Sequence, residues 1–284
     1  MNKTSIEWTD FTWNPIRANL KGARGPRPHT GTFCTRVSPG CTNCYASVIN
    51  KRFGNGLEYT VPNLERVEFF IDEKILAEPL RRKKPARIFV ADMFDLFHEA
   101  IPPEFIAEVL RVALKIPRHT FQFLTKRAER MRDLVNRAQE HWGVKFGQHM
   151  HFGVSVEDQQ RADERIPLLL QTPAAVRFLS VEPQLEEIDI RAYLATGLIH
   201  LVIDGGESGT SARRFNLAWA ESLLGQCKAA GVPFFMKQIG SKPEPYGWRF
   251  SQGVRDRKGG DPAEWPESLR VREFPKAAVA EEAR

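Results

Sequence analysis

The chain repeats one pattern of apolar and polar positions over most of its length. Short runs of β-branched and aromatic residues, each ending in polar residues, alternate with stretches whose apolar residues recur at helical spacing. The runs lie at residues 87–94, 120–126, 151–158, 176–183, 200–209 and 233–240. Strands and helices alternating at these lengths predict βαβ units and a parallel sheet.

Three of the intervening stretches predict helices. Residues 102–116 place four apolar side chains at helical intervals, and residues 71–80 predict another helix before the first clear strand. Residues 216–231 open on Asn216 as an N-cap and close on Gly231 as a C-terminal stop.

These elements predict an α/β fold, a partial or complete parallel βα barrel of the TIM-like kind. Six strand–helix repeats, with an earlier extended piece at residues 5–13, are more than a small open sheet needs. We expect residues 1–240 to form the barrel. Residues 241–284 are rich in proline, glycine and charge without a regular period, which predicts an irregular C-terminal cap.

Composition narrows the class of protein. The chain has 284 residues and 42% hydrophobic residues, with no run of 18 apolar residues and no signal peptide at its start. We therefore expect no membrane segment and a cytoplasmic or equivalent reducing location. Four cysteines in a chain of this length do not indicate a disulfide framework.

Basic residues are unevenly placed. The 41 basic and 35 acidic residues give a net charge of +6, yet residues 11–57 contain no Asp or Glu. The short basic runs at 81–84 and 213–214 are interpreted as solvated faces. The acid-free segment is equally suited to face an anion, such as nucleic acid phosphates, a cofactor carboxylate or a negatively charged cluster.

Polar residues gather where the predicted strands end. The set is Asp92, Asp95, Thr125, Lys126, Ser155, Glu157, Ser180, Glu182, Lys237, Gln238 and the stretch 204–209. In parallel α/β folds ligands bind at that edge, so these residues predict a binding site. Among them we favour Lys126, Glu182 and Glu207.

The stretch Asp204–Gly209 has its own signal. Gly205 and Gly206 would let a ligand approach the backbone closely, and the chain then leads toward a helix N-terminus that favours anions. It is neither a Walker loop nor a Rossmann fingerprint, because the required spacings are absent. A tight turn would have the same sequence.

Three of the four cysteines lie within eleven residues, at Cys34, Cys41 and Cys44, whereas Cys227 falls on the apolar face of a predicted helix. A structural zinc site needs four ligands, and His29 could be the fourth. A disulfide is less favoured in a reducing compartment, and a catalytic cysteine would not need the other two.

The remaining alternative is a [4Fe-4S] cluster with three cysteine ligands and one iron open to S-adenosyl-L-methionine. Three thiolates, basic surroundings and a barrel with polar strand ends together favour this cluster.

The sequence also resembles a known family. "SIEWTDFTWNP", "VSPGCTNCYA", "FLTKRAERM", "GVSVEDQ", "FLSVEP", "GGESG" and "PFFMKQIG" are similar to motifs of the phage and prophage three-cysteine family, which is similar to radical S-adenosylmethionine enzymes. The resemblance implies a radical S-adenosylmethionine-type barrel in which Cys34, Cys41 and Cys44 hold the cluster and Tyr45 packs beside it. It does not indicate a substrate.

Two features depart from the broader superfamily. The first cysteine gap is six residues where three are usual, and Gly205–Gly206–Glu207 comes near the end where a Gly-Gly-Glu element normally follows the second strand. Asp92 or Asp95 could therefore fill the position of that element.

The function predicted from the sequence is that of a radical S-adenosylmethionine-like enzyme. An electron from an external donor would cleave the sulfonium, and the resulting 5′-deoxyadenosyl radical would abstract hydrogen from the substrate. The basic cysteine segment and the resemblance favour a nucleic acid or nucleotide as that substrate, and a small-molecule reaction stays open. No catalytic side chain is assigned. The predicted cofactor-binding residues are Asp92, Asp95, Lys126, Ser155, Glu157, Glu182, Gly205, Gly206, Glu207 and Lys237. The alternative is a zinc-stabilised nucleic-acid-binding protein without catalysis. Core packing is expected of Trp8 and Trp13.

Overall fold

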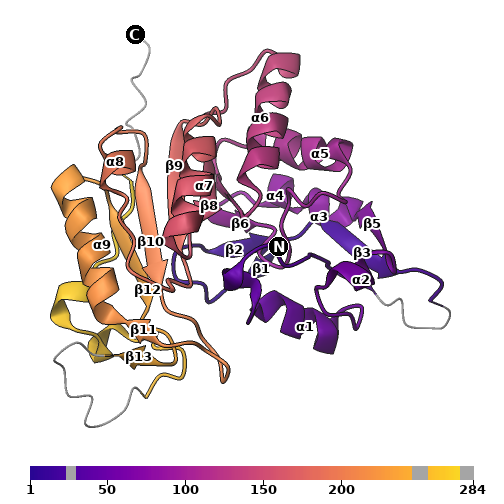
Figure 1. Cartoon of the computed structure of the whole chain (residues 1–284). Helices are drawn as coiled ribbons and strands as arrows, with labels where there is room; N and C mark the ends of the chain where they lie inside the picture. Colours follow the sequence, from indigo (N-terminus) through magenta and orange to yellow (C-terminus); the bar gives the residue numbers. More distant parts are fainter. Residues whose placement is uncertain (24–29, 245–254, 276–284) are drawn as a thin grey trace.

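One curled sheet of eight strands organises the chain (Figure 1). The computed structural model describes residues 1–23, 30–244 and 255–275. β1 pairs antiparallel with β2, and the other neighbours in the sheet are parallel. In sheet order the strands are β1 (Asn2–Lys3), β2 (Phe11–Trp13), β6 (Arg87–Val90), β7 (Thr120–Thr125), β8 (Met150–Ser155), β9 (Val176–Val181), β10 (Leu201–Gly205) and β12 (Phe234–Gln238).

The six strands predicted from the apolar runs are confirmed, as β6 to β10 and β12, in chain order across the sheet. Each is shorter than its run, because the polar residues at the end of the run belong to the following loop. The result is an open half-barrel: among the described strands, β1 and β12 are the two edges.

The two faces of the sheet bury different apolar clusters. Alternate residues point to opposite faces of a strand, so in β10 Leu201 and Ile203 face the inside of the half-barrel and Val202 faces the helices. Trp8 packs inside with Phe89, at a ring-centroid distance of 4.7 Å.

Helices cover the convex face. They are α5 (Pro103–Leu114), α6 (Ala128–Trp142), α7 (Gln159–Leu170), α8 (Arg191–Leu194) and α9 (Leu217–Ala230). The predicted caps of α9 are confirmed: Asn216 accepts a hydrogen bond from the Ala218 amide at 3.0 Å, and Gly231 adopts the left-handed conformation at φ 66°. Trp8 and Trp13 are buried as expected.

The single helix predicted at residues 71–80 is wrong in part. The chain forms two short helices there, α3 (Glu73–Leu76) and α4 (Glu78–Arg81). Pro79 lies in the first turn of α4, where its fixed φ and missing N–H are tolerated but where they stop α3 from continuing.

A smaller three-stranded antiparallel sheet stands beside the half-barrel. It has the order β4 (Thr30–Gly31), β3 (Ile16–Leu20) and β5 (Val67–Ile71), and it packs with α1 (Tyr45–Phe53) and α2 (Val61–Leu64). Asn50 of α1 is buried. It accepts from the Thr32 amide at 3.1 Å and donates to the Leu57 carbonyl at 2.9 Å. These bonds fix α1 against the small sheet.

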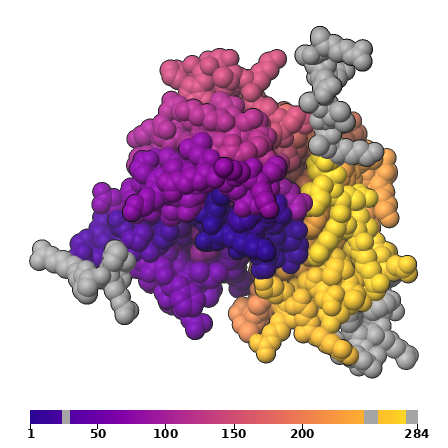
Figure 2. Space-filling model, turned by 180° about the vertical axis from the view of Figure 1, so that it is seen from behind, coloured from indigo at the N-terminus to yellow at the C-terminus, as the bar shows by residue number. Residues whose placement is uncertain are grey.

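The described part of the C-terminal segment, residues 255–275, runs along the edge strand β12. The Met236 amide donates to the Val271 carbonyl and the Glu273 amide donates to the Phe234 carbonyl, so this segment protects the edge. Figure 2 shows it (yellow) beside the N-terminal segment (indigo). The short strands β11 (Phe215–Asn216) and β13 (Pro243–Glu244) pair with each other.

Three-residue 3-10 turns occur at Pro39–Cys41, Pro262–Glu264 and Glu267–Leu269. No helix in the described ranges is long and apolar enough to cross a membrane.

Replacing Phe152 with Ala is expected to lower the free energy of unfolding by about 3–5 kcal/mol. Phe152 is fully buried and stacks on Phe123 with ring centroids 5.0 Å apart, so the change opens a cavity between sheet and helices. Urea unfolding measures the effect. The exposed Leu198→Ala is the control, and a loss for Phe152→Ala no larger than that of the control would contradict this packing.

Candidate metal and cofactor site

A cavity of about 570 Å³ lies where the carboxyl ends of the sheet strands meet the segment from Cys34 to Cys44, here called the cysteine loop. Its volume is in the range of small-molecule sites. All three cysteines and seven of the ten predicted cofactor-binding residues line it. These residues are Cys34, Cys41, Cys44, Asp92, Asp95, Lys126, Ser155, Glu182, Glu207 and Lys237.

Glu157, Gly205 and Gly206 are not among the residues that line the cavity. The two glycines instead allow close backbone packing: a Cβ on Gly206 would lie 2.8 Å from the Ile239 carbonyl oxygen. In this structure, the paired glycines therefore allow the segment that contains them to pack closely against the segment around Ile239.

The cysteines reach the cavity from three positions along the loop. Cys34 follows β4, Cys41 ends the first 3-10 turn, and Cys44 immediately precedes α1. Burial raises the pKa of the Cys34 thiol to about 12 and also raises the pKa of Cys44, and the charge of Cys41 adds to both effects. The three thiols are thus close enough to influence one another.

In the described ranges, no three His, Cys, Asp or Glu side chains are gathered closely enough to hold a metal ion. His29, the fourth zinc ligand considered above, lies outside the described residues.

Asp95 and Arg127 anchor the start of the loop. Arg127 donates to Asp95 at 3.1 Å, to the Thr35 hydroxyl at 2.9 Å and to the Cys34 sulfur at 3.7 Å. Burial would raise the pKa of Asp95, but Arg127 and the hydrogen bond from Thr125 hold it below its ordinary value. Asp95 is therefore a charged anchor, and Arg127 brings a positive charge to Cys34.

Glu157 anchors the middle of the loop. This fully buried carboxylate accepts hydrogen bonds from the Ser38 hydroxyl and, at 3.3 Å, from the Gly40 amide, and it pairs with Arg165 at 2.8 Å. Burial would raise the pKa of Glu157, but Lys126, Arg165 and Ser38 together lower it. Gly40 is required here, because a Cβ would lie 2.9 Å from the carboxylate.

Glu207 anchors the end of the loop. It accepts from Asn43 at 2.9 Å and pairs with Arg213 at 2.8 Å, and Arg213 also donates to the Pro39 carbonyl at 3.0 Å. The interpretation of residues 213–214 as a solvated run is therefore wrong for Arg213. Its guanidinium joins the loop after β10 to the cysteine loop.

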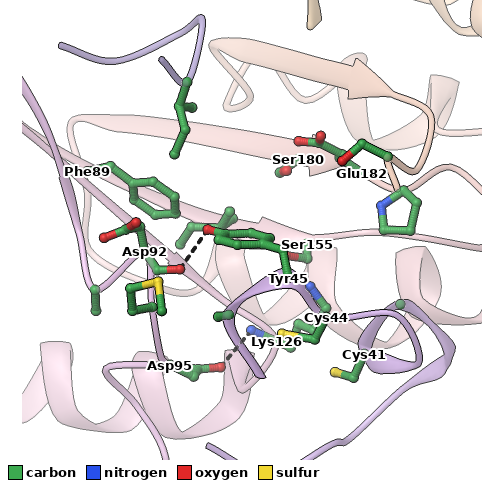
Figure 3. A pocket seen from close by; sticks show the side chains of 18 of the residues that line it. Cys41, Cys44, Tyr45, Phe89, Asp92, Asp95, Lys126, Ser155, Ser180 and Glu182 are labelled. Atoms are coloured by element: carbon green, nitrogen blue, oxygen red, sulfur yellow. Dashed lines mark hydrogen bonds between the residues drawn. The ribbon is translucent and has the colours of Figure 1, made fainter. Parts of the chain in front are cut away.

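Asp92 and Tyr45 meet at the centre of the cavity wall (Figure 3). The Tyr45 hydroxyl donates to the Asp92 carbonyl at 2.7 Å, and the Asp92 carboxylate accepts from Asn14 at 2.7 Å. Burial raises the pKa of Asp92 despite that hydrogen bond. Burial thus disfavours the charged form of Asp92.

Three lysines, Lys126, Lys237 and Lys258, line the cavity. Lys237 pairs with Glu182. The ammonium group of Lys126 has no hydrogen-bond or salt-bridge partner within the described part of the chain, although it lines the cavity near Cys44. An anionic group of a ligand would satisfy Lys126.

Arg127 and Arg165 were missed by sequence reasoning. Arg127 directly follows the predicted strand-end residue Lys126, so its position in the sequence could have indicated that it lies near the site. Arg165 lies within α7, where no sequence pattern indicates such a role.

The fold and site together define an α/β half-barrel whose strand ends and three-cysteine loop enclose one cavity. The chain belongs to the family described as "Protein of unknown function (DUF5131)", whose model matches residues 3–265. No curated protein and no solved structure matches the chain.

Proposed function

We propose that this protein is a radical S-adenosylmethionine-like enzyme, with a [4Fe-4S] cluster held by Cys34, Cys41 and Cys44. The observation that carries the proposal is that the three thiols of one loop line the same cavity as the polar strand ends. We also propose that the half-barrel is of the radical S-adenosylmethionine type. We further propose that the protein is related to the phage three-cysteine family.

The donor set fits such a cluster. Thiolates are the usual ligands of iron–sulfur clusters, and three of them leave one iron free for a cofactor. Arg127, 3.7 Å from the Cys34 sulfur, favours the thiolate that burial disfavours. When bound, the cluster would supply the electron that cleaves S-adenosylmethionine and starts radical chemistry.

The lining residues would bind and orient S-adenosylmethionine. We assign Lys126 to the methionyl carboxylate, because its ammonium lines the cavity and makes no hydrogen bond or salt bridge with the described residues. Ser155 and Glu182 would take hydroxyl groups of the ribose, with Lys237 holding Glu182 in place. Asp95, Glu157 and Glu207 would act on the cysteine loop rather than on the cofactor.

The substrate is proposed to be a nucleic acid or a nucleotide. The acid-free segment 11–57 includes the whole cysteine loop and α1, so these two elements carry positive charge and no Asp or Glu. Phosphate contacts would make substrate affinity fall steeply with salt concentration.

Metal analysis tests the proposal. After anaerobic reconstitution with iron and sulfide, we expect about four iron and four sulfide per chain. One tightly bound zinc per chain that excludes iron would instead support the zinc-stabilised alternative, in which the chain binds nucleic acid without catalysis.

Replacing Lys126 with Met is expected to weaken S-adenosylmethionine binding about 10- to 100-fold, since a charge-assisted hydrogen bond contributes roughly 1.5–3 kcal/mol. Equilibrium dialysis of the reconstituted protein measures the affinity. The exposed Lys145→Met is the matched control. An unchanged affinity in Lys126→Met would remove this residue from the cofactor site.

A further inference from the structure

A second hollow in the described surface lies at the end of the sheet opposite the cavity. Its volume is about 430 Å³, and the loop between α4 and β6 forms much of its wall. That loop precedes the first residue of β6, whereas the cavity lies at the carboxyl ends of the strands. We call this feature the basic hollow, because its lining includes Phe11, Glu78 and the four consecutive basic residues Arg81, Arg82, Lys83 and Lys84.

The protein does not neutralise the positive charge of the basic hollow. None of the four basic side chains forms a salt bridge within the described part of the chain. Glu78 pairs with the Met1 amine, and Asp10, which precedes Phe11, pairs with Arg87 at 3.1 Å. Both neighbouring carboxylates are thus bound to other cations. The four charges remain available to an anion from outside the protein.

The backbone that carries these charges is held in place. Arg118 donates to the Arg82 and Leu80 carbonyls, both at 2.8 Å. It also donates to the Pro79 carbonyl at 3.3 Å. The Arg82 guanidinium lies 4.1 Å from the centre of the Phe11 ring, and its Nε is buried without a hydrogen-bond partner among the described residues. Stacking of this kind orients the guanidinium before a ligand arrives, which lowers the entropic cost of binding.

Exposure and chemistry together select a ligand with repeated negative charges. Arg81, Lys83 and Lys84 are exposed, and a single exposed ion pair contributes less than about 1 kcal/mol. A nucleic acid strand presents phosphates in series and releases counterions at each contact, and guanidinium and ammonium groups both bind phosphate. A protein partner would need an apolar centre, but Arg82 covers the Phe11 ring.

We propose that the basic hollow binds the phosphate backbone of a nucleic acid strand, at a site separate from the cavity. The contacts would be independent of base sequence, because they are made to phosphates rather than to base edges. This site goes beyond the proposed function, since phosphate binding here requires neither the cluster nor S-adenosylmethionine. It would hold a strand on the protein and leave the cavity open at the opposite end of the sheet.

The test removes two of the four charges by combining Lys83→Gln with Lys84→Gln. Both side chains are exposed, so the fold is retained, and circular dichroism verifies it. The matched control combines Lys145→Gln with Lys228→Gln, which removes the same charge from exposed positions elsewhere. Fluorescence anisotropy with a labelled single-stranded oligonucleotide measures the affinity at several salt concentrations, on protein prepared without iron.

Loss of two phosphate contacts should weaken binding about tenfold at about 0.1 M salt and reduce the slope of log affinity against log salt by about 1.4. The control should bind like the unaltered protein. The same affinity and slope in the two double variants would overturn the basic hollow, as would an unaltered protein that does not bind the oligonucleotide.

Two further measurements separate the alternatives. Displacement of the oligonucleotide by polyglutamate of equal length, at equal concentration, would overturn the assignment to nucleic acid and favour an acidic protein. Iron loading and S-adenosylmethionine binding should be unchanged when Lys83 and Lys84 are replaced, because the basic hollow is remote from the cavity. Their absence in every variant, with oligonucleotide binding as expected, would count against the proposed function alone.

Discussion

Cys41→Ala is expected to hold less than about one iron per chain after reconstitution, compared with the roughly four that we expect of the unaltered protein. Cys41 ends the turn at the centre of the cysteine loop, and its charge acts on both Cys34 and Cys44. Without it, two thiolates remain, one fewer than the proposed cluster needs.

Cys227→Ala is the matched control. Cys227 is fully buried on α9 and does not line the cavity, so this variant should load iron normally. Iron and sulfide assays with the visible absorption of the cluster provide the measurement. Full iron loading of Cys41→Ala would show that the cluster is bound elsewhere.

Glu157→Ala is expected to lower the free energy of unfolding by about 3–5 kcal/mol, the usual cost of leaving one partner of a buried ion pair alone. The variant leaves Arg165, itself buried, without its carboxylate and releases Ser38 and Gly40 of the cysteine loop. Urea unfolding measures the stability, and hydrogen exchange at residues 38–41 should increase.

Glu164→Ala, on the same helix as Arg165, is the control. Its side chain is 51% exposed and lies 3.8 Å from Arg161, so the change should cost less than about 1 kcal/mol. If Glu157→Ala is as stable as the control, Glu157 does not anchor the loop.

The ion pair also predicts a pH dependence. The pKa of Glu157 is lowered in the folded state, so its contribution to stability is complete above the unfolded pKa and is lost as pH falls through the folded pKa. Acid unfolding of Glu157→Gln should therefore depend less on pH than that of the unaltered protein. Identical acid profiles would contradict the lowered pKa.

The main sheet and the location of the cavity could be predicted from the sequence because they depend on short-range patterns. Runs such as residues 176–183 are apolar over a strand length and end in polar residues, and parallel strands bring those ends to one edge. The spacing of Cys34, Cys41 and Cys44 likewise needs no tertiary information to suggest a shared site.

The roles of the strand-end carboxylates could not be predicted, because they depend on partners distant in sequence. Asp95 contacts Arg127 across 32 residues, and Glu157 contacts Ser38 across 119. A carboxylate that binds a ligand and one that anchors a loop have the same appearance in a sequence. The division of residues 71–80 into α3 and α4 could have been predicted from Pro79. The prediction of one helix gave more weight to the apolar spacing than to this proline.

The central claim is that the three cysteines hold a [4Fe-4S] cluster with one iron open to S-adenosylmethionine. Low-temperature electron paramagnetic resonance of the anaerobically reconstituted, reduced protein, with and without S-adenosylmethionine, tests it most directly. We predict a reduced [4Fe-4S] signal that changes when S-adenosylmethionine is added. A cluster signal that is unaffected by S-adenosylmethionine, or a chain that binds one zinc and builds no cluster, would contradict the account.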